Sequence, residues 1–255
     1  MLIDTQLHLI DQVRFPMSRQ SGGYLPGPEV QADHARLIAV LDRHDVAKGV
    51  LVQPSGYGSD NTALFEALEE GGERFRAVVM CAQGAVPELV SAGAKAVRLN
   101  MTDFAGHDPK RAAELGKAVL EGGLALQVQA GPEPLEQLLD RLPDGSVIID
   151  HLGRPDPHND TSLARVAAMA QRPETWLKVS GGFRIEDDWR RPTSGLRDLV
   201  ARWPSDRVIW GSDWPFLNCG GQVPRYGETL AWGRKLTDLD IASRNAAQLF
   251  GWADG

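Results

Sequence analysis

The chain reads Val-Ile-Ile-Asp-His-Leu-Gly-Arg at residues 147–154, where a short apolar run passes directly into charged and turn-forming residues. A continuous apolar run of this length is typical of a parallel strand that is buried on both faces. Just upstream, residues 135–142 place four leucines at the i, i+3, i+4, i+7 spacing of an amphipathic helix. The stretch therefore predicts a helix followed by a buried strand, with polar groups at the carboxyl end of the strand.

The same unit recurs along the whole chain. Eight apolar runs of strand length occur at 2–4, 49–53, 77–80, 96–99, 124–128, 147–150, 176–179 and 208–210. Helical spacing is clear again at 196–203 and weaker at 37–41, 64–68, 115–119 and 163–170. Alternating strands and helices predict a parallel sheet covered by helices, and eight units predict one (β/α)8 barrel domain over residues 1–255. An open doubly wound sheet is the alternative.

Composition limits the possible partners and compartments. The 255 residues are 42% hydrophobic, which is enough for one sizeable core, and the net charge of −7 disfavours nucleic acid as a partner. The chain has no apolar run of ~18 residues, and its start lacks the features of a signal peptide. We therefore expect no membrane partner and a cytoplasmic location. Cys81 and Cys219 show no paired spacing and are expected to be structural thiols.

Polar residues follow nearly every apolar run, and three of them suggest catalysis. His8 follows the first run, His151 the sixth and Asp213 the eighth. The first and eighth strands of a closed barrel are neighbours, so His8 and Asp213 are expected to face one cavity. A carboxylate beside imidazoles is suited to activating water. The other histidines have charged neighbours in helical or loop stretches and are expected at the surface: His34, His44, His107 and His158.

Three arginines are expected at the same end of the barrel. Arg98 lies within an apolar run, Arg154 follows His151, and Arg184 follows a Ser-Gly-Gly turn. A buried arginine needs a partner because an unpaired charge is costly to bury. Guanidinium groups bind carboxylates in a bidentate manner, so the three together favour an anionic substrate that carries carboxylates.

Five blocks of sequence, in order, resemble the lactonase branch of the amidohydrolase superfamily, and most of all the 2-pyrone-4,6-dicarboxylate lactonases. The blocks are Asp-x-Gln-x-His at 4–8, the segment from 51–55 to 58–61, 97–100, 149–156 and 208–215. The resemblance runs from residue 3 to about residue 250 and so covers essentially the full chain.

The resemblance implies a distorted (β/α)8 barrel that hydrolyses a cyclic ester to its open-chain acid, commonly without a bound metal. Asp213 matches the aspartate that acts as general base on water, and His151 and His8 match active-site histidines. The residues expected to bind the substrate or its carboxylates are Ser55, Tyr24, Arg98, Arg154, Arg184, Gln6, Asn100 and Gln127.

The chain departs from the superfamily pattern at its metal-binding positions. Gln6 replaces the first histidine of the usual His-x-His pair, and the fifth run offers Gln127 and Gln129 in place of a metal-binding residue. These amides argue against a binuclear site. A single zinc or manganese ion held by His8, His151 and Asp213 remains the alternative to the expected metal-free site, because three such ligands suffice for a catalytic zinc.

We therefore expect an aromatic-compound catabolic hydrolase that opens the lactone ring of a small carboxylate-bearing substrate, similar to 2-pyrone-4,6-dicarboxylate, using water activated by Asp213. The first alternative is a zinc- or manganese-dependent lactonase acting on a muconolactone or a sugar lactone. A non-catalytic anion-binding protein and a metal-dependent decarboxylase are further alternatives. A serine nucleophile, Ser55 or Ser180, is disfavoured because the chain has no Gly-x-Ser-x-Gly element. Phe216 stands where the pyrone lactonases have histidine, which leaves the identity of the lactone open.

Overall fold

Eight parallel strands form the centre of the molecule in the computed structural model, which describes residues 1–17, 24–81, 85–102, 108–221 and 223–252. The strands are β1 (Leu2–Leu7), β2 (Val46–Val52), β3 (Phe75–Val79), β4 (Ala96–Asn100), β5 (Ala125–Gln129), β6 (Val147–Ile149), β7 (Thr175–Val179) and β8 (Val208–Trp210). Each strand pairs in parallel with the next one along the chain. Each of the eight runs predicted from the sequence contributes one strand.

The barrel closes between β1 and the segment that follows β8. Leu7 forms a parallel bridge with Trp214, and the His8 amide donates a hydrogen bond of 2.9 Å to the Trp214 carbonyl. The Asp213 amide in turn donates to the Gln6 carbonyl at 2.9 Å. Closure through a loop makes the barrel distorted, and it brings Asp213 beside His8. The predicted barrel is confirmed, and the open-sheet alternative is wrong.

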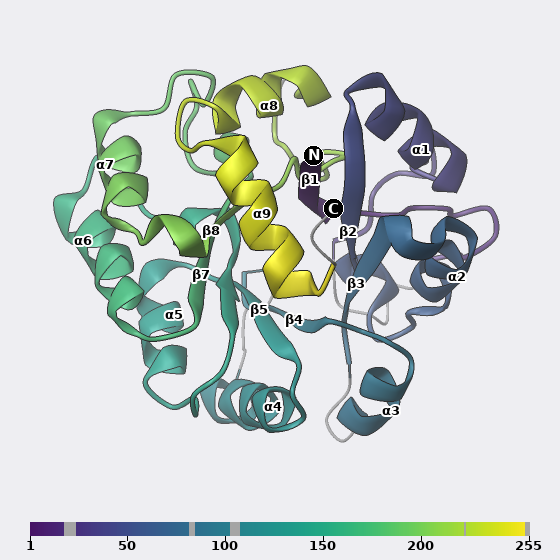
Figure 1. Cartoon of the computed structure of the whole chain (residues 1–255), viewed down its shortest axis with the longest axis horizontal. Helices are drawn as coiled ribbons and strands as arrows, with labels where there is room; N and C mark the ends of the chain where they lie inside the picture. Colours follow the sequence, from purple (N-terminus) through teal and green to yellow (C-terminus); the bar gives the residue numbers. More distant parts are fainter. Residues whose placement is uncertain (18–23, 82–84, 103–107, 222, 253–255) are drawn as a thin grey trace.

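Helices surround the barrel (Figure 1). They are α1 (His34–Arg43), α2 (Thr62–Gly71), α3 (Val86–Ser91), α4 (Pro109–Glu121), α5 (Pro132–Leu139), α6 (Asp160–Ala168), α7 (Ser194–Arg202), α8 (Tyr226–Gly233) and α9 (Leu239–Phe250). Side-chain caps at Asp33, Asn159 and Thr193 accept amide hydrogen bonds at the starts of α1, α6 and α7. The leucine-spaced helices predicted at 135–142 and 196–203 are α5 and α7.

The barrel interior is divided into an apolar half and a polar half. At the amino ends of the strands, apolar side chains such as Ile3, Ile148 and Trp176 pack with Phe250 of α9 and with Trp252. In Figure 1, α9 (yellow) lies across the middle of the molecule, where it contacts β8 and β1. The apolar end is therefore plugged by the last helix, which leaves the carboxyl ends of the strands for the polar side chains.

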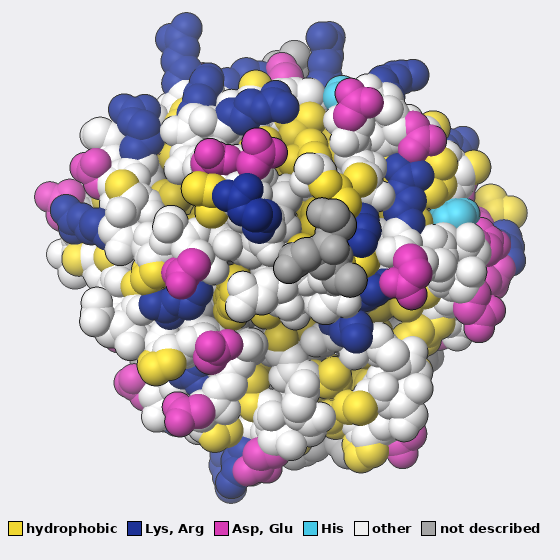
Figure 2. All heavy atoms as spheres, viewed as in Figure 1, with side chains coloured by type: hydrophobic (Ala, Val, Ile, Leu, Met, Phe, Trp, Pro, Cys, Tyr) yellow, Lys and Arg dark blue, Asp and Glu magenta, His cyan; other side chains and the backbone are white. Residues whose placement is uncertain are grey.

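The outer surface mixes charges of both signs. Figure 2 shows lysine and arginine side chains interspersed with aspartate and glutamate over the face in view. Of the predicted surface histidines, His158 is exposed, whereas His34 and His44 are half-buried. His34 pairs with Glu70, and His44 stacks on Tyr226. His107 lies outside the described residues.

Two further sequence expectations concern the cysteines and the membrane. Cys81 and Cys219 are partly buried free thiols. Within the described ranges, no helix combines the length and apolar character that crossing a membrane requires.

Candidate active site

A pocket of about 440 Å³ of empty space, part of it open to solvent, lies at the carboxyl ends of the strands. It is lined by His8, Tyr24, Pro54, Ser55, Arg98, Gln129, His151, Arg184, Asp213, Leu217 and Asn218. The three predicted catalytic residues are thus brought together, with Ser55, Tyr24, Arg98 and Arg184 from the predicted binding set.

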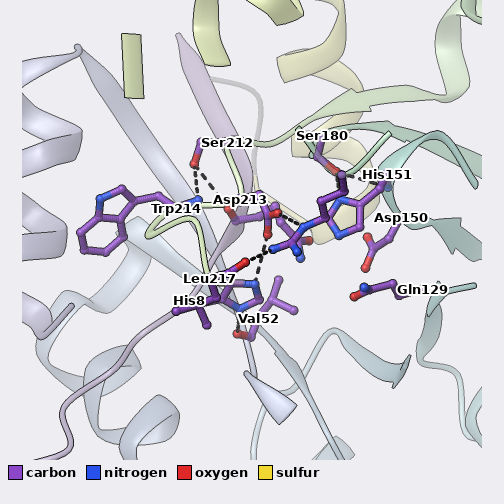
Figure 3. A network of polar contacts seen from close by, with 12 residues as sticks. His8, Val52, Gln129, Asp150, His151, Ser180, Ser212, Asp213, Trp214 and Leu217 are labelled. Carbon is purple, nitrogen blue, oxygen red and sulfur yellow. Dashed lines mark hydrogen bonds and ion pairs between the residues drawn. The ribbon is translucent and has the colours of Figure 1, made fainter. Parts of the chain in front are cut away.

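Asp213 is fully buried and lies between His8 and Arg184. Figure 3 shows it beside His8. Its Oδ1 is 3.3 Å from His8 Nε2, and its Oδ2 accepts a hydrogen bond of 2.6 Å from Arg184 Nε. Burial alone would raise the pKa of Asp213, but Arg184, His151 and His8 outweigh burial and hold this pKa well below its usual range. The Asp213 side chain is therefore an ionised carboxylate at neutral pH.

His8 is oriented by the backbone of β2. Its Nδ1 lies 2.8 Å from the carbonyl oxygen of Val52. Because a carbonyl only accepts hydrogen bonds, Nδ1 must carry the proton, and Nε2 is the nitrogen that faces Asp213. The second imidazole nitrogen is thus aimed at the buried carboxylate.

His151 is held by Ser180 at the end of β7 (Figure 3). Its Nδ1 lies 2.9 Å from Ser180 Oγ, which also accepts a 3.3 Å hydrogen bond from the His151 amide. Burial lowers the pKa of His151 from 6.5 to about 4, although Asp213 and Asp150 oppose the shift. The imidazole is therefore neutral at neutral pH. When the Ser180 hydroxyl donates to Nδ1, Nε2 carries the proton and can donate a hydrogen bond.

The two serines considered as nucleophiles have supporting contacts instead. Ser180 is fully buried and is not part of the pocket wall. Ser55 Oγ accepts hydrogen bonds from Arg98 Nη1 at 3.2 Å and from Asn100 Nδ2 at 3.0 Å. The hydroxyl hydrogen of Ser55 is therefore the part of the group that can donate to a ligand.

The arginines take three different positions. Arg98 donates from Nη1 to the Gln53 carbonyl at 3.1 Å and from Nη2 to Gln129 Oε1 at 2.5 Å. Arg184 holds Asp213 and also donates from Nη2 to the Leu217 carbonyl at 2.8 Å. The structure does not bring Arg154 into the pocket wall. Arg98 and Arg184 therefore line the pocket, each braced by protein oxygens, and the charge of Arg154 lies close enough to His151 to lower the pKa of its imidazole.

A buried polar layer lies beneath the pocket. Gln6 Oε1 accepts hydrogen bonds from Gln127 Nε2 at 3.1 Å and from Lys178 Nζ at 2.6 Å. Lys178 Nζ is 3.0 Å from Asp150 Oδ1, and Gln127 Nε2 donates to Asp150 Oδ2 at 2.9 Å. All four side chains are fully buried. Gln6 and Gln127 therefore support the pocket from below, and Asn100 does so through Ser55.

Lys178 was not among the residues that sequence reasoning selected. It lies inside an apolar run, which is the same signal that singled out Arg98. Gln129, Leu217 and Asn218 were also missed as pocket residues. The two from the loop after β8 carry no signal in sequence, because only the fold places that loop over the pocket.

Among the residues that the structure describes, no three histidine, cysteine, aspartate or glutamate side chains converge closely enough to hold a metal ion. Asp213 Oδ2 accepts a hydrogen bond from Arg184 Nε, and His151 Nδ1 lies against Ser180 Oγ. The arrangement of His8, His151 and Asp213 suits proton transfer and hydrogen bonding instead.

Comparison with known proteins identifies the family of this chain. The amidohydrolase family model matches residues 3–252. The chain belongs to the amidohydrolase family.

Two curated proteins that are similar in sequence to this chain are named as lactone hydrolases. It is 28% identical over 222 residues to 2-pyrone-4,6-dicarboxylate hydrolase of Comamonas testosteroni, with 77% of this chain and 72% of that protein covered. It is 27% identical over 233 residues to 4-sulfomuconolactone hydrolase of Hydrogenophaga intermedia, with 83% and 74% covered.

A solved structure shares the fold over nearly its whole length. It comes from Acinetobacter baumannii and is described as a probable 2-pyrone-4,6-dicarboxylic acid hydrolase with citric acid bound. The two superpose with a TM-score of 0.82 at 24% identity, covering 98% of this chain and 99% of that one.

Proposed function

We propose that this protein is a lactone hydrolase that opens the ring of a small carboxylate-bearing lactone, similar to 2-pyrone-4,6-dicarboxylate, without a metal ion. The observation that carries the proposal is the meeting of Asp213, His8 and neutral His151 in one pocket that also contains Arg98 and Arg184. The names of the curated relatives support the reaction class.

Asp213 is the group that takes the proton from water. Water loses a proton to the carboxylate while its oxygen bonds to the lactone carbonyl carbon, and the bond from that carbon to the ring oxygen then breaks. The proton passes from Asp213 to the departing ring oxygen, so that an acid and a hydroxyl group result. Because the positive charge of Arg184 disfavours protonated Asp213, the carboxylate holds the proton only briefly.

His151 stabilises the charge that develops on the carbonyl oxygen. A neutral imidazole that receives a hydrogen bond on Nδ1 from Ser180 presents an Nε2–H donor to the pocket. One such donor contributes roughly 10²–10³-fold in rate in measured enzymes. The burial that keeps His151 neutral also makes the hydrogen bond stronger than it would be in water.

The substrate carboxylates are bound at the pocket wall. Ser55 retains a hydroxyl hydrogen to donate, and Arg98 lies next to it. Arg184 Nη1 forms no hydrogen bond within the described part of the chain, so this nitrogen is placed to bind a carboxylate while Nε stays on Asp213. Citric acid, a carboxylate compound, is the ligand in the similar structure from Acinetobacter baumannii.

Asp213→Asn tests the assignment of the base. The amide cannot take a proton from water, so kcat for a lactone is expected to fall by about 10³-fold or more. Asp206→Asn, at an exposed position before β8, is the matched control and should keep full activity.

A binding measurement distinguishes loss of the catalytic base from damage to the pocket. Asp213→Asn should still bind the ring-opened product, which carries one more carboxylate than the lactone, in a calorimetric titration, because Ser55 and Arg98 are unchanged. Near-normal turnover in Asp213→Asn would refute the role of Asp213 as base.

A further inference from the structure

The seam of the barrel, between β1 and the segment after β8, is closed by side chains as well as by backbone. Among the described residues, β1 and β8 form no paired ladder, and the parallel bridge at the seam lies beyond the end of β8. Thr5 Oγ1 donates a hydrogen bond of 2.7 Å to the Trp210 carbonyl. Asp4 crosses the same seam, since its Oδ1 accepts a hydrogen bond of 2.9 Å from the Ser212 amide. Side chains of β1 therefore take the place of strand pairing here.

Asp4 is a fully buried carboxylate that accepts three hydrogen bonds. Its Oδ1 accepts from the Gln6 amide at 3.0 Å as well as from Ser212, and its Oδ2 accepts from the Tyr226 hydroxyl at 2.6 Å. Burial raises the pKa of Tyr226 well above its usual value, so this hydroxyl keeps the proton that it donates. Three segments, β1, the turn after β8 and the start of α8, therefore meet at one side chain.

Joining these segments does not by itself account for a carboxylate at this position. The three donors are all neutral groups, and burying a carboxylate among neutral groups is costly. Burial raises the pKa of Asp4, and the hydrogen bonds from Ser212, Tyr226 and Gln6 oppose that shift. The cost is accounted for if the exact placement of the turn after β8 matters to the reaction.

The turn after β8 carries Asp213. Asp213 directly follows Ser212, and its φ of 67° is a conformation that persists only where contacts enforce it. Ser212 Oγ accepts a hydrogen bond of 3.1 Å from the Trp214 amide, so Ser212 is fixed through both its amide and its hydroxyl (Figure 3). Gly211 allows the close approach to β1, because a Cβ atom at this position would lie 2.7 Å from the Gln6 nitrogen. The turn that carries Asp213 is thus held against β1.

His8 is fixed from the other side. It lies directly after β1, and its imidazole is oriented by the Val52 carbonyl on β2, a contact that does not involve Asp213. Arg184 contacts the Oδ2 atom of Asp213 from the loop after β7. The 3.3 Å separation between His8 Nε2 and Asp213 Oδ1 therefore depends on where the turn after β8 is held.

We propose that Asp4 is a positioning residue of the active site: its carboxylate ties the turn that carries Asp213 to β1 and thereby sets the contact between Asp213 and His8. It acts through the backbone of Ser212 and is not part of the pocket wall. The inference deepens the proposed function, so its kinetic measurements rest on that function, whereas its spectroscopic measurement does not.

Steady-state kinetics on Asp4→Ala and Asp4→Asn test the inference. Asp4→Ala should lower kcat for a lactone by about 100-fold with little change in KM, because a shift of ~1 Å has that effect on catalysis while Ser55 and Arg98 are untouched. Asp4→Asn keeps an oxygen for the Ser212 amide, so its kcat should stay within about 10-fold of the wild type, the effect of one altered hydrogen bond. Unchanged kcat in Asp4→Ala, or equal losses in the two variants, would overturn the inference.

A double-substitution cycle distinguishes action through Asp213 from a general loss of packing. In protein that already carries Asp213→Asn, adding Asp4→Ala should lower the residual kcat by no more than about 3-fold, because the group that Asp4 positions is already gone. A further loss of about 100-fold would show that Asp4 acts independently of Asp213, which contradicts the inference.

Asn245→Ala is the matched control for the loss of buried hydrogen bonds. Asn245 lies on α9 and donates to the carbonyls of Ser205 and Val208, at 2.7 and 2.8 Å, at the amino end of β8. This variant should lose stability but keep the kcat of the wild type. A loss of kcat as large as that of Asp4→Ala would show that the position of Asp4 is not special, and the inference would fail.

Asp4→Ser is the second variant if Asp4→Ala does not fold. A serine hydroxyl can still accept from the amide two residues ahead, that of Gln6, but it is one bond too short to reach Ser212 across the seam. Asp4→Ser should therefore show the same loss of kcat, and unchanged kcat in this variant would contradict the inference.

Nitrogen NMR of protein with isotope-labelled histidines follows the contact without a substrate. The His8 signals are identified by their loss in His8→Gln. In Asp4→Ala they should shift towards their positions in Asp213→Asn, because the carboxylate has moved away from Nε2, whereas in Asn245→Ala they should match the wild type. Wild-type His8 signals in a folded Asp4→Ala would overturn the inference. If the wild type opens no lactone at all, the proposed function fails, and the His8 signals still decide whether Asp4 places Asp213.

Discussion

Three residues that line the pocket have backbone conformations that are rare outside glycine. His151 has φ 51°, Asp213 has φ 67° and Asn218 has φ 49°. Such conformations cost of order 1–3 kcal/mol each and persist only where surrounding contacts enforce them. Here the contacts are hydrogen bonds from the His151 amide to Ser180 and from the Asp213 amide to the Gln6 carbonyl. His151 and Asp213 are also the groups with the proposed chemical roles.

Gly181 is the residue that allows His151 to lie where it does. It has φ +61°, and a Cβ atom at this position would lie 2.5 Å from His151 Nδ1. Gly181→Ala is therefore expected to displace the imidazole and reduce kcat by about 100-fold, since a shift of ~1 Å has that effect in active sites. Steady-state kinetics on a lactone substrate measure this loss.

Gly123→Ala provides the control for backbone strain. Gly123 has φ +79°, with nothing within 4 Å of an added Cβ. Both variants should lose about 1–2 kcal/mol in unfolding free energy, but only Gly181→Ala should lose activity. Equal activity in the two would show that contact with His151 is unimportant.

Burial of neutral His151 predicts a pH dependence of stability. Its pKa falls from 6.5 to about 4 on folding, so above pH 6.5 neither the folded nor the unfolded state binds the proton. As the pH falls from 6.5 towards 4, only the unfolded state binds it, and about 3 kcal/mol of unfolding free energy is lost. Urea unfolding at pH 7 and pH 4 should show this extra loss in the wild type relative to His151→Gln. The same pH dependence in both proteins would contradict it.

The three proposed catalytic residues could be predicted from the sequence more completely than the residues that contact them. His8, His151 and Asp213 follow apolar runs, and the closed barrel brings such positions together. The contact of Arg184 with Asp213 joins two loops and depends on their backbone turns, which no local pattern encodes. The failure to select Lys178 was avoidable, since a lysine in a buried strand needs a partner as much as Arg98 does.

At the scale of elements, the final helix completes the barrel. The sequence pattern predicted strands from apolar runs and helices from the segments between them. No strand follows α9, so that pattern did not predict this helix. Its residues Ala246, Ala247 and Phe250 pack into the amino end of the barrel against strand residues such as Ile209. The Ile3 amide also donates to Ser243 Oγ at 3.1 Å, so α9 ties the two ends of the chain together.

Phe250→Ala tests whether α9 is a structural plug separate from the pocket. Phe250 is 1% exposed, and truncation is expected to lower the unfolding free energy by about 3–5 kcal/mol through lost burial and a cavity. Because the pocket lies at the other end of the barrel, kcat and KM should stay unchanged at temperatures where the variant is folded. Thermal unfolding and steady-state kinetics measure the two effects. A loss of kcat in the folded variant would show that the two ends are coupled.

At the scale of the whole molecule, the net charge and the local charge differ in sign. The chain carries −7 overall, yet the pocket and its floor contain Arg98, Arg184 and Lys178 against Asp150 and Asp213. Because nearby charges act more strongly than distant ones in salt solution, the pocket can attract a small carboxylate within an acidic protein. The net charge of the chain thus predicts weak binding of large polyanions, but it does not predict which small ligand a pocket binds.

The most direct test of the proposed function is acid release by the metal-depleted wild-type protein. The protein is treated with a chelator, its metal content is measured, and a panel of pyrone dicarboxylate, muconolactones and sugar lactones is assayed with and without added zinc. We predict hydrolysis of a carboxylate-bearing lactone at well under one metal ion per chain, with no stimulation by zinc. Acid release that appears only when zinc is added, or no release from any lactone, would contradict the proposal.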